Sequence, residues 1–138
     1  MKLPYSICPN RHGGFFYSAI LKVSLALPVP NSPRTDRIEA LIDSGSTRCL
    51  FHADIGRFLG LDVTMGAKEE TLGISGLDIT YLHDVVLYIP GGAVVIKAGF
   101  KENLPLAGLL GMQGFFEHFV ITFDQNALAC DLQRIAHA

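Results

Sequence analysis

Residues 40–47 carry the side chains best suited to chemistry, because an apolar run delivers Asp43 into a turn of small, hydroxyl-bearing residues. A carboxylate at the end of a buried strand needs hydrogen-bond partners. Ser44 and Ser46 offer hydroxyls, and Gly45 offers a backbone conformation closed to residues that carry a Cβ. Such a turn would hold the carboxylate rigidly with one oxygen facing outward, which suits general acid–base chemistry.

A second apolar run, residues 107–111, ends in Gly111 and has no polar side chain of its own. Taken alone, it predicts only a buried strand with a close backbone approach at the glycine. The segment becomes informative through its place in the order of elements along the chain. An apolar–apolar–Asp–Ser–Gly segment comes first, the apolar–apolar–Gly segment comes much later, and a short helix and a final hairpin are expected after it.

Three pieces in this order resemble the retropepsin-like aspartic proteases, especially the single-domain forms found in bacterial genomes. Residues 41–47 resemble the catalytic signature, hydrophobic–hydrophobic–Asp–Thr/Ser–Gly–Ser/Ala/Thr. Leu109, Leu110 and Gly111 resemble the later hydrophobic–hydrophobic–Gly element, which in the family packs beside the catalytic loop in a ψ-shaped crossing. Residues 114–124 resemble the helix and strand that close the domain. The resemblance as a whole covers about residues 14–135.

The resemblance implies an all-β fold, a pepsin-like closed β-barrel half-domain with one or two short helices and a ψ-loop around Asp43. It implies an aspartic endopeptidase in which Asp43 is catalytic and Ser44, Gly45 and Ser46 support the catalytic loop. One departure concerns a charged pair of many retroviral members, because Thr47 and Met112 occupy its two positions here. Both charges are absent together, which argues against a retroviral style of dimer contact at that point.

A single Asp-Ser-Gly motif predicts a homodimer. One carboxylate cannot act as acid and base in the same step, and a second motif of this kind does not occur in the chain. Two-fold symmetry would place each Asp43 beside its twin. The substrate, a peptide or protein, would lie across the dimer in extended form. Gly73, Ile74, Ser75 and Gly76 are predicted to form a mobile hairpin flap over it, with an ordinary turn as the alternative.

Other interpretations of Asp43 stay open at this point. The aspartate would also fit a purely structural turn in which its carboxylate caps neighbouring N–H groups. The domain would then be a catalytically idle, dimeric peptide-binding or scaffold module, or a monomer with an unrelated ligand. A serine hydrolase is disfavoured, because the chain has no Gly-x-Ser-x-Gly elbow.

Hydrophobic patterning predicts short strands and little helix. Residues 21–27 alternate apolar and polar side chains as a half-buried strand does, and residues 38–42 form a second apolar run. Residues 85–89 and 94–96 flank a Pro-Gly-Gly turn, and residues 120–123 and 127–132 flank Asp-Gln-Asn, so each pair predicts a hairpin. A helix is expected near residues 53–59 with Gly60 at its end, and a further turn or two after Gly114.

Composition narrows the function classes. The 138 residues, 49% hydrophobic and 17% charged, predict a single folded domain over residues 1–138, with residues 1–13 as a flexible leader or an edge strand. The net charge of −2 disfavours nucleic-acid binding, and no apolar run is long enough for a membrane span. Three cysteines without an export signal predict free thiols and a cytoplasmic location. The dispersed histidines predict no metal, and no other cofactor is expected. These histidines are His12, His52, His83, His118 and His137.

Overall fold

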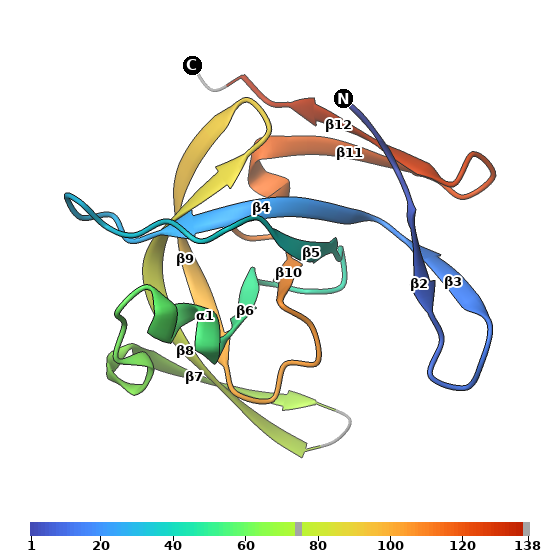
Figure 1. The fold of residues 1–138 in the computed structure, drawn as a ribbon. Helices are drawn as coiled ribbons and strands as arrows, with labels where there is room; N and C mark the ends of the chain where they lie inside the picture. The colour runs from blue at the N-terminus through green and yellow to red at the C-terminus, as the bar shows by residue number, and fades with distance from the viewer. Residues whose placement is uncertain (74–75, 137–138) are drawn as a thin grey trace.

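The computed structural model describes residues 1–73 and 76–136, and strands make up most of it (Figure 1). The strands are β1 (Lys2–Pro4), β2 (Ser6–Pro9), β3 (Phe15–Ser18), β4 (Ile20–Ala26), β5 (Ile38–Ile42), β6 (Leu50–His52), β7 (Ala67–Gly73), β8 (Gly76–Ile89), β9 (Gly92–Lys101), β10 (Gly108–Leu110), β11 (Phe119–Asp124) and β12 (Ala129–Arg134). They are joined by helix α1 (Ala53–Phe58) and two 3₁₀ turns, η1 (Val63–Met65) and η2 (Phe116–His118). The predicted all-β class is confirmed.

Six strands form a closed ring. The order β4-β5-β10-β6-β9-β8 returns to its start, because Ser24 of β4 pairs with Tyr88 of β8, and β7 extends the sheet from β8. Within the ring, β10 runs parallel to β5 and antiparallel to β6. Strand β10 is therefore inserted between two segments that precede it by more than fifty residues, which places the loop between β5 and β6 beside the end of β10.

The barrel core follows from period-two burial. In β4, Leu21, Val23 and Leu25 are buried and Lys22 is exposed, but Ser24 is also buried, at the point where β8 begins to pair with β4. Alternate side chains of a strand point to opposite faces, so the apolar set of β4 faces the core. The largest fully buried side chains come from several strands and the segment before η2, and they are Phe51, Phe100, Phe115, Leu25 and Leu87. The strands predicted at residues 21–27 and 38–42 are confirmed to within one residue at their ends.

Both predicted hairpins are present. Strands β8 and β9 meet at the register pair Ile89–Gly92, and Gly91 at their turn has a positive φ of 86°. They are much longer than the apolar patterns at residues 85–89 and 94–96 predicted. In the second hairpin the Asp124 carboxylate accepts N–H bonds from Asn126 and Ala127, and β12 begins two residues later than expected.

The N-terminal residues contain two strands. Strand β1 pairs with β12, which pairs with β11, and this three-stranded sheet lies at the end of the molecule opposite the β7–β8 hairpin (Figure 1). Strands β2 and β3 form a separate hairpin, whose Phe15 and Ile7 are 74% and 63% exposed. Strand β1 lies at the edge of its three-stranded sheet.

Helical structure is short, as predicted. The His52 side chain accepts the Asp54 N–H at the start of α1. Past its end, the Gly60 N–H donates to the Arg57 carbonyl while Gly60 adopts a positive φ of 93°. The helical segment expected after Gly114 is the single 3₁₀ turn η2. Within residues 1–73 and 76–136, no helix is long and apolar enough to cross a membrane.

Candidate active site

Asp43 follows directly after β5, and its carboxylate is held by the backbone of its own loop. The Asp43 N–H donates to the Leu110 carbonyl at 3.0 Å, which ties the start of the loop to β10. The Gly45 N–H donates to Asp43 Oδ1 at 2.9 Å, and the Ser46 N–H donates to the Asp43 carbonyl at 3.2 Å. The side chain is half-buried, and no residue in the described part of the chain donates a hydrogen bond to Oδ2. One carboxylate oxygen is therefore anchored and the other is free to take part in chemistry.

Gly45 serves a different purpose from the one predicted. Its φ lies outside the positive region, so the expectation of a conformation closed to other residues is wrong. A Cβ at this position would lie 3.1 Å from Asp43 Oδ1, which is closer than most real contacts of a Cβ. The absence of a side chain lets the Gly45 N–H approach the carboxylate. The reason for the glycine is close approach, which a motif alone cannot separate from backbone freedom.

The two serines lie in the loop, but the Ser46 hydroxyl acts on the backbone. It donates to the Arg48 carbonyl at 2.7 Å and so closes the second half of the loop. Ser44 is exposed at the tip. The carboxylate is accordingly positioned by N–H groups, whereas the hydroxyl of Ser46 stiffens the segment that carries it.

Gly111 lies against the Asp43 loop. The N–H groups of Met112 and Gln113 donate to the carbonyls of Ser46 and Thr47, each at 2.8 Å. A Cβ on Gly111 would lie 2.3 Å from the Arg48 carbonyl oxygen, a distance that no side chain tolerates. Leu109 and Leu110 pair with Leu41 and Ile42 in the parallel β5–β10 register. The structure therefore brings these two distant sequence segments together.

An ion pair that the sequence did not predict links the loop to β7. Arg48 Nε lies 2.9 Å and 3.0 Å from the two carboxylate oxygens of Glu69. Their side chains are 22% and 33% exposed, so the pair is partly shielded from water. Arg48 and Glu69 are 21 residues apart, and no motif connects them. Only the three-dimensional course of β7 beside the loop could have revealed the pair.

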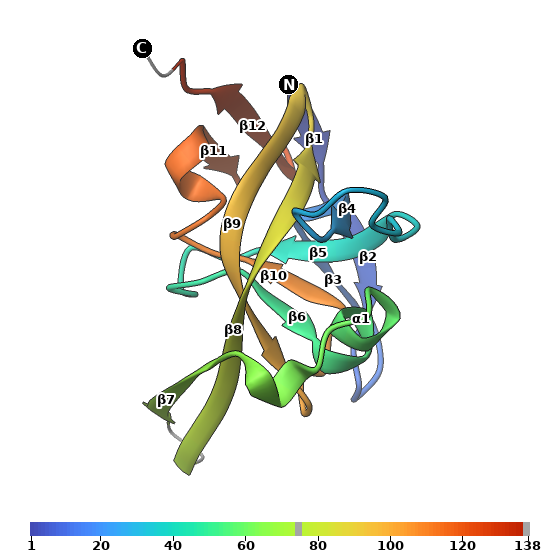
Figure 2. The same cartoon turned by 90° about the vertical axis from the view of Figure 1, so that its left-hand side faces the viewer.

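The predicted flap coincides with the end of the β7–β8 hairpin. Gly73 and Gly76 are its last paired residues, while Ile74 and Ser75 lie outside the described residues. Figure 2 shows the end of this hairpin and the loop between β5 and β6 on the same side of the molecule, with the hairpin below. The flap role of these four residues stays a prediction.

Titratable groups near the loop include a buried thiol. Cys49 is fully buried, and burial raises the pKa of its thiol to about 11. All three cysteines are free, as predicted. Across the described ranges there is no cluster of three His, Cys, Asp or Glu side chains able to hold a metal ion.

The closed ring, the parallel β5–β10 pair and the aspartate loop between β5 and β6 together define a retropepsin-like fold. A retropepsin-like aspartic protease from Rickettsia conorii matches with a TM-score of 0.63 at 19% sequence identity, over 94% of this chain and 98% of its own. EIAV protease, in complex with the inhibitor HBY-793, matches with a TM-score of 0.51 at 15% identity, over 68% of this chain and 81% of its own. No family model and no curated protein sequence matches the chain. The shared feature is the fold.

Proposed function

We propose that the chain is an aspartic endopeptidase, active as a cytoplasmic homodimer in which each copy contributes Asp43. The observation that carries the proposal is the loop geometry. A half-buried carboxylate is fixed through Oδ1 by the Gly45 N–H, and its loop is clamped by the backbone around Gly111. A merely structural aspartate would gain little from an Oδ2 left without a donor among the described residues.

The chemistry requires a second carboxylate. One carboxylate takes a proton from water as it attacks the peptide carbonyl, and the other, protonated, donates to the carbonyl oxygen. Two carboxylates roughly 3 Å apart share one proton because both cannot ionise; this behaviour is established for aspartic proteases as a class and is adopted from it. A two-fold axis beside Asp43 would supply the pair from identical loops. Gly45, Ser44 and Ser46 then maintain the loop.

A substrate peptide would lie between the Asp43 loops and the β7–β8 hairpins. The EIAV protease structure contains an inhibitor, and an analogous groove here would admit an extended peptide. We assign the hairpin end, from Gly73 to Gly76, the role of a covering flap. Its position on the same side as the Asp43 loop supports this assignment (Figure 2).

The decisive experiment combines a broad peptide library with Asp43→Asn. Wild-type protein should cleave peptides, and the variant should lose at least about a thousandfold in kcat/KM because a required acid–base group is gone. Asn keeps an oxygen that accepts the Gly45 N–H, so the variant should retain the wild-type unfolding midpoint. A statine-type inhibitor should block cleavage by the wild-type protein. A stable dimer that cleaves nothing would instead identify an idle peptide-binding module, and cleavage that survives Asp43→Asn would refute the proposal.

A further inference from the structure

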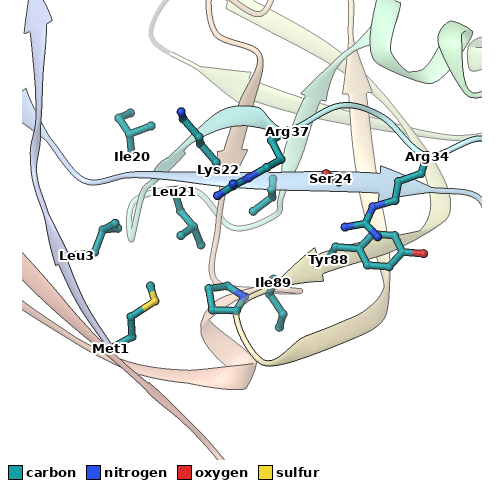
Figure 3. Close-up of a pocket in the computed structure, with 12 residues that line it drawn as sticks. Met1, Leu3, Ile20, Leu21, Lys22, Ser24, Arg34, Arg37, Tyr88 and Ile89 are labelled. Atoms are coloured by element: carbon teal, nitrogen blue, oxygen red, sulfur yellow. The ribbon is translucent and has the colours of Figure 1, made fainter.

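A cavity of about 570 Å³ opens on the edge of β4 (Figure 3). None of its lining residues belongs to the Asp43 loop. Five consecutive residues of β4, numbers 20–24, line it, together with side chains of β1 and β8. Successive side chains of a strand point to opposite faces, so a cavity that touches all five lies along the edge of the strand. Its size is that of a site for a ligand or a short peptide.

This edge of β4 has backbone groups without strand partners. Ala19 accepts an N–H bond from Ile42 of β5, and Leu25 accepts one from Thr35 in the segment before β5, so the odd-numbered residues of β4 direct their backbone groups to that side. The even-numbered residues therefore direct theirs to the opposite edge. There β8 pairs with β4 only from Ser24 onward, because β8 ends at Ile89 and turns at Pro90. Within the described residues no strand pairs with this edge at Ile20 and Lys22.

Three cations surround the cavity, and none of them forms an ion pair with a residue that the structure describes. They are Lys22, Arg34 and Arg37 (Figure 3). The Arg34 guanidinium stacks 3.8 Å from the centre of the Tyr88 ring, an arrangement that leaves its N–H edge available for a carboxylate. Glu39 lies opposite Lys22 in the β4–β5 register, yet it lines a different cavity.

Ser24 also lines the cavity, with 3% of its surface exposed. An unpaired strand edge and unpaired cations thus occur together at this place.

We propose that this cavity binds an acidic peptide in extended form. The peptide pairs as an added strand with the free edge of β4 at Ile20 and Lys22. Alternate carboxylates of the peptide meet the cations of Lys22, Arg34 and Arg37. Side chains of the opposite parity lie on the apolar floor that Leu21 provides. Binding here does not depend on proteolysis at Asp43.

The test is a titration of ¹⁵N-labelled Asp43→Asn protein with an acetylated, amidated octapeptide that alternates Glu and Val. Saturable shifts are expected at the amides of Ile20 and Lys22, and a Lys/Val peptide of equal length should give none. Arg34→Gln and Arg37→Gln should each weaken binding about fivefold at low salt, since each removes one exposed charge pair. The matched control Arg11→Gln removes an exposed cation that does not line the cavity, and it should leave the affinity unchanged.

Two N-methylated peptides test strand pairing itself. Methylation of every second amide, in one register or the other, blocks hydrogen bonding at alternate positions of the peptide. One of the two should bind like the parent, and the other should lose most of its affinity. Equal binding of both would overturn the added strand, as would shifts confined to the Asp43 loop or no shifts at all. Phosphatidylserine vesicles that bind more tightly than the peptide and depend on Arg34 and Arg37 would identify an anionic membrane surface instead.

Discussion

At the scale of single residues, two glycines constrain the Asp43 loop in different ways, and alanine substitutions should separate them. Gly111→Ala would place a Cβ 2.3 Å from a backbone oxygen, so it should destabilise the fold by about 3 kcal/mol. Gly45→Ala would place a Cβ 3.1 Å from Asp43 Oδ1, which a small carboxylate shift relieves. It should leave the urea midpoint nearly unchanged and lower kcat on the best library peptide.

The control for this comparison is Gly60→Ala, in which strain arises from the positive φ without any nearby atom. It should cost about 1 kcal/mol and leave kcat untouched, because Gly60 follows α1 and is not part of the loop. Equal losses of kcat in Gly45→Ala and Gly60→Ala would contradict a carboxylate-positioning role for Gly45.

Cys49 predicts a specific pH dependence of stability. Burial raises the pKa of its thiol from 9.0 to about 11 in the folded protein. Between those values the folded protein keeps the proton that the unfolded chain releases, so stability present below pH 9 is lost as the pH rises through 11. The loss should reach about 2 kcal/mol. Urea unfolding of wild type and Cys49→Ala at pH 8 to 11 checks it, because the difference between the two should shrink over this range.

A stability difference between wild type and Cys49→Ala that stays constant over this pH series would show that the buried thiol does not hold its proton.

At the scale of elements, the Arg48–Glu69 pair couples the Asp43 loop to the hairpin that we assign as a flap. A double-mutant cycle with Arg48→Gln and Glu69→Gln should give a coupling of about 1 kcal/mol, because both charged groups are partly shielded. If the hairpin closes over substrate, each single variant should raise KM more than it lowers kcat. Steady-state kinetics on a peptide substrate measures the change in KM and the change in kcat separately.

Lys68 and Glu70, on the same strand, make a matched exposed pair. Their groups lie 3.1 Å apart with both side chains 50% exposed, so the corresponding cycle should give no more than about 0.3 kcal/mol. The variants of this second cycle should leave KM unchanged. A KM effect of equal size in both cycles would mean that any loss of charge on β7 disturbs the hairpin.

The sequence predicted elements well where local pattern and final environment agree. Strand β5 matches residues 38–42 because an apolar run there is buried in the barrel. Only residues 85–89 of the 14-residue strand β8 were predicted, since its earlier part lies largely outside the core and carries polar residues such as Asp78 and Asp84. Strand β6 has only three residues and therefore no readable period. Strand β1 depends on β12, whose residues lie more than 120 positions away.

The candidate site was likewise predicted only in part from the sequence. Asp43 and Gly111 were found because the chemistry of each segment, and their order, are visible in the sequence. Their contact depends on β10 entering between β5 and β6, which local pattern does not specify. The Arg48–Glu69 pair and the hydroxyl partner of Ser46 were not predicted for the same reason. Long-range backbone geometry, rather than residue type, determines these contacts.

At the scale of the whole molecule, the decisive property is that one chain holds one Asp43 and the proposed chemistry needs two. Activity should therefore depend on association, and specific activity should fall when the protein is diluted below its dimer dissociation constant. Wild type mixed with Asp43→Asn gives a sharper measurement. The variant keeps the oxygen that accepts the Gly45 N–H, so mixed dimers should form as readily as the parent.

In an equal mixture that has exchanged subunits, about a quarter of the dimers contain two Asp43 residues. Total activity at constant total protein should then follow the square of the wild-type fraction, because a dimer with one carboxylate lacks either the acid or the base. Mixing with Asp62→Asn, an exposed aspartate outside the loop, should leave activity unchanged at every ratio. A linear decline with Asp43→Asn would mean that a single Asp43 suffices, and the symmetric dyad would have to be abandoned even if the protein is dimeric.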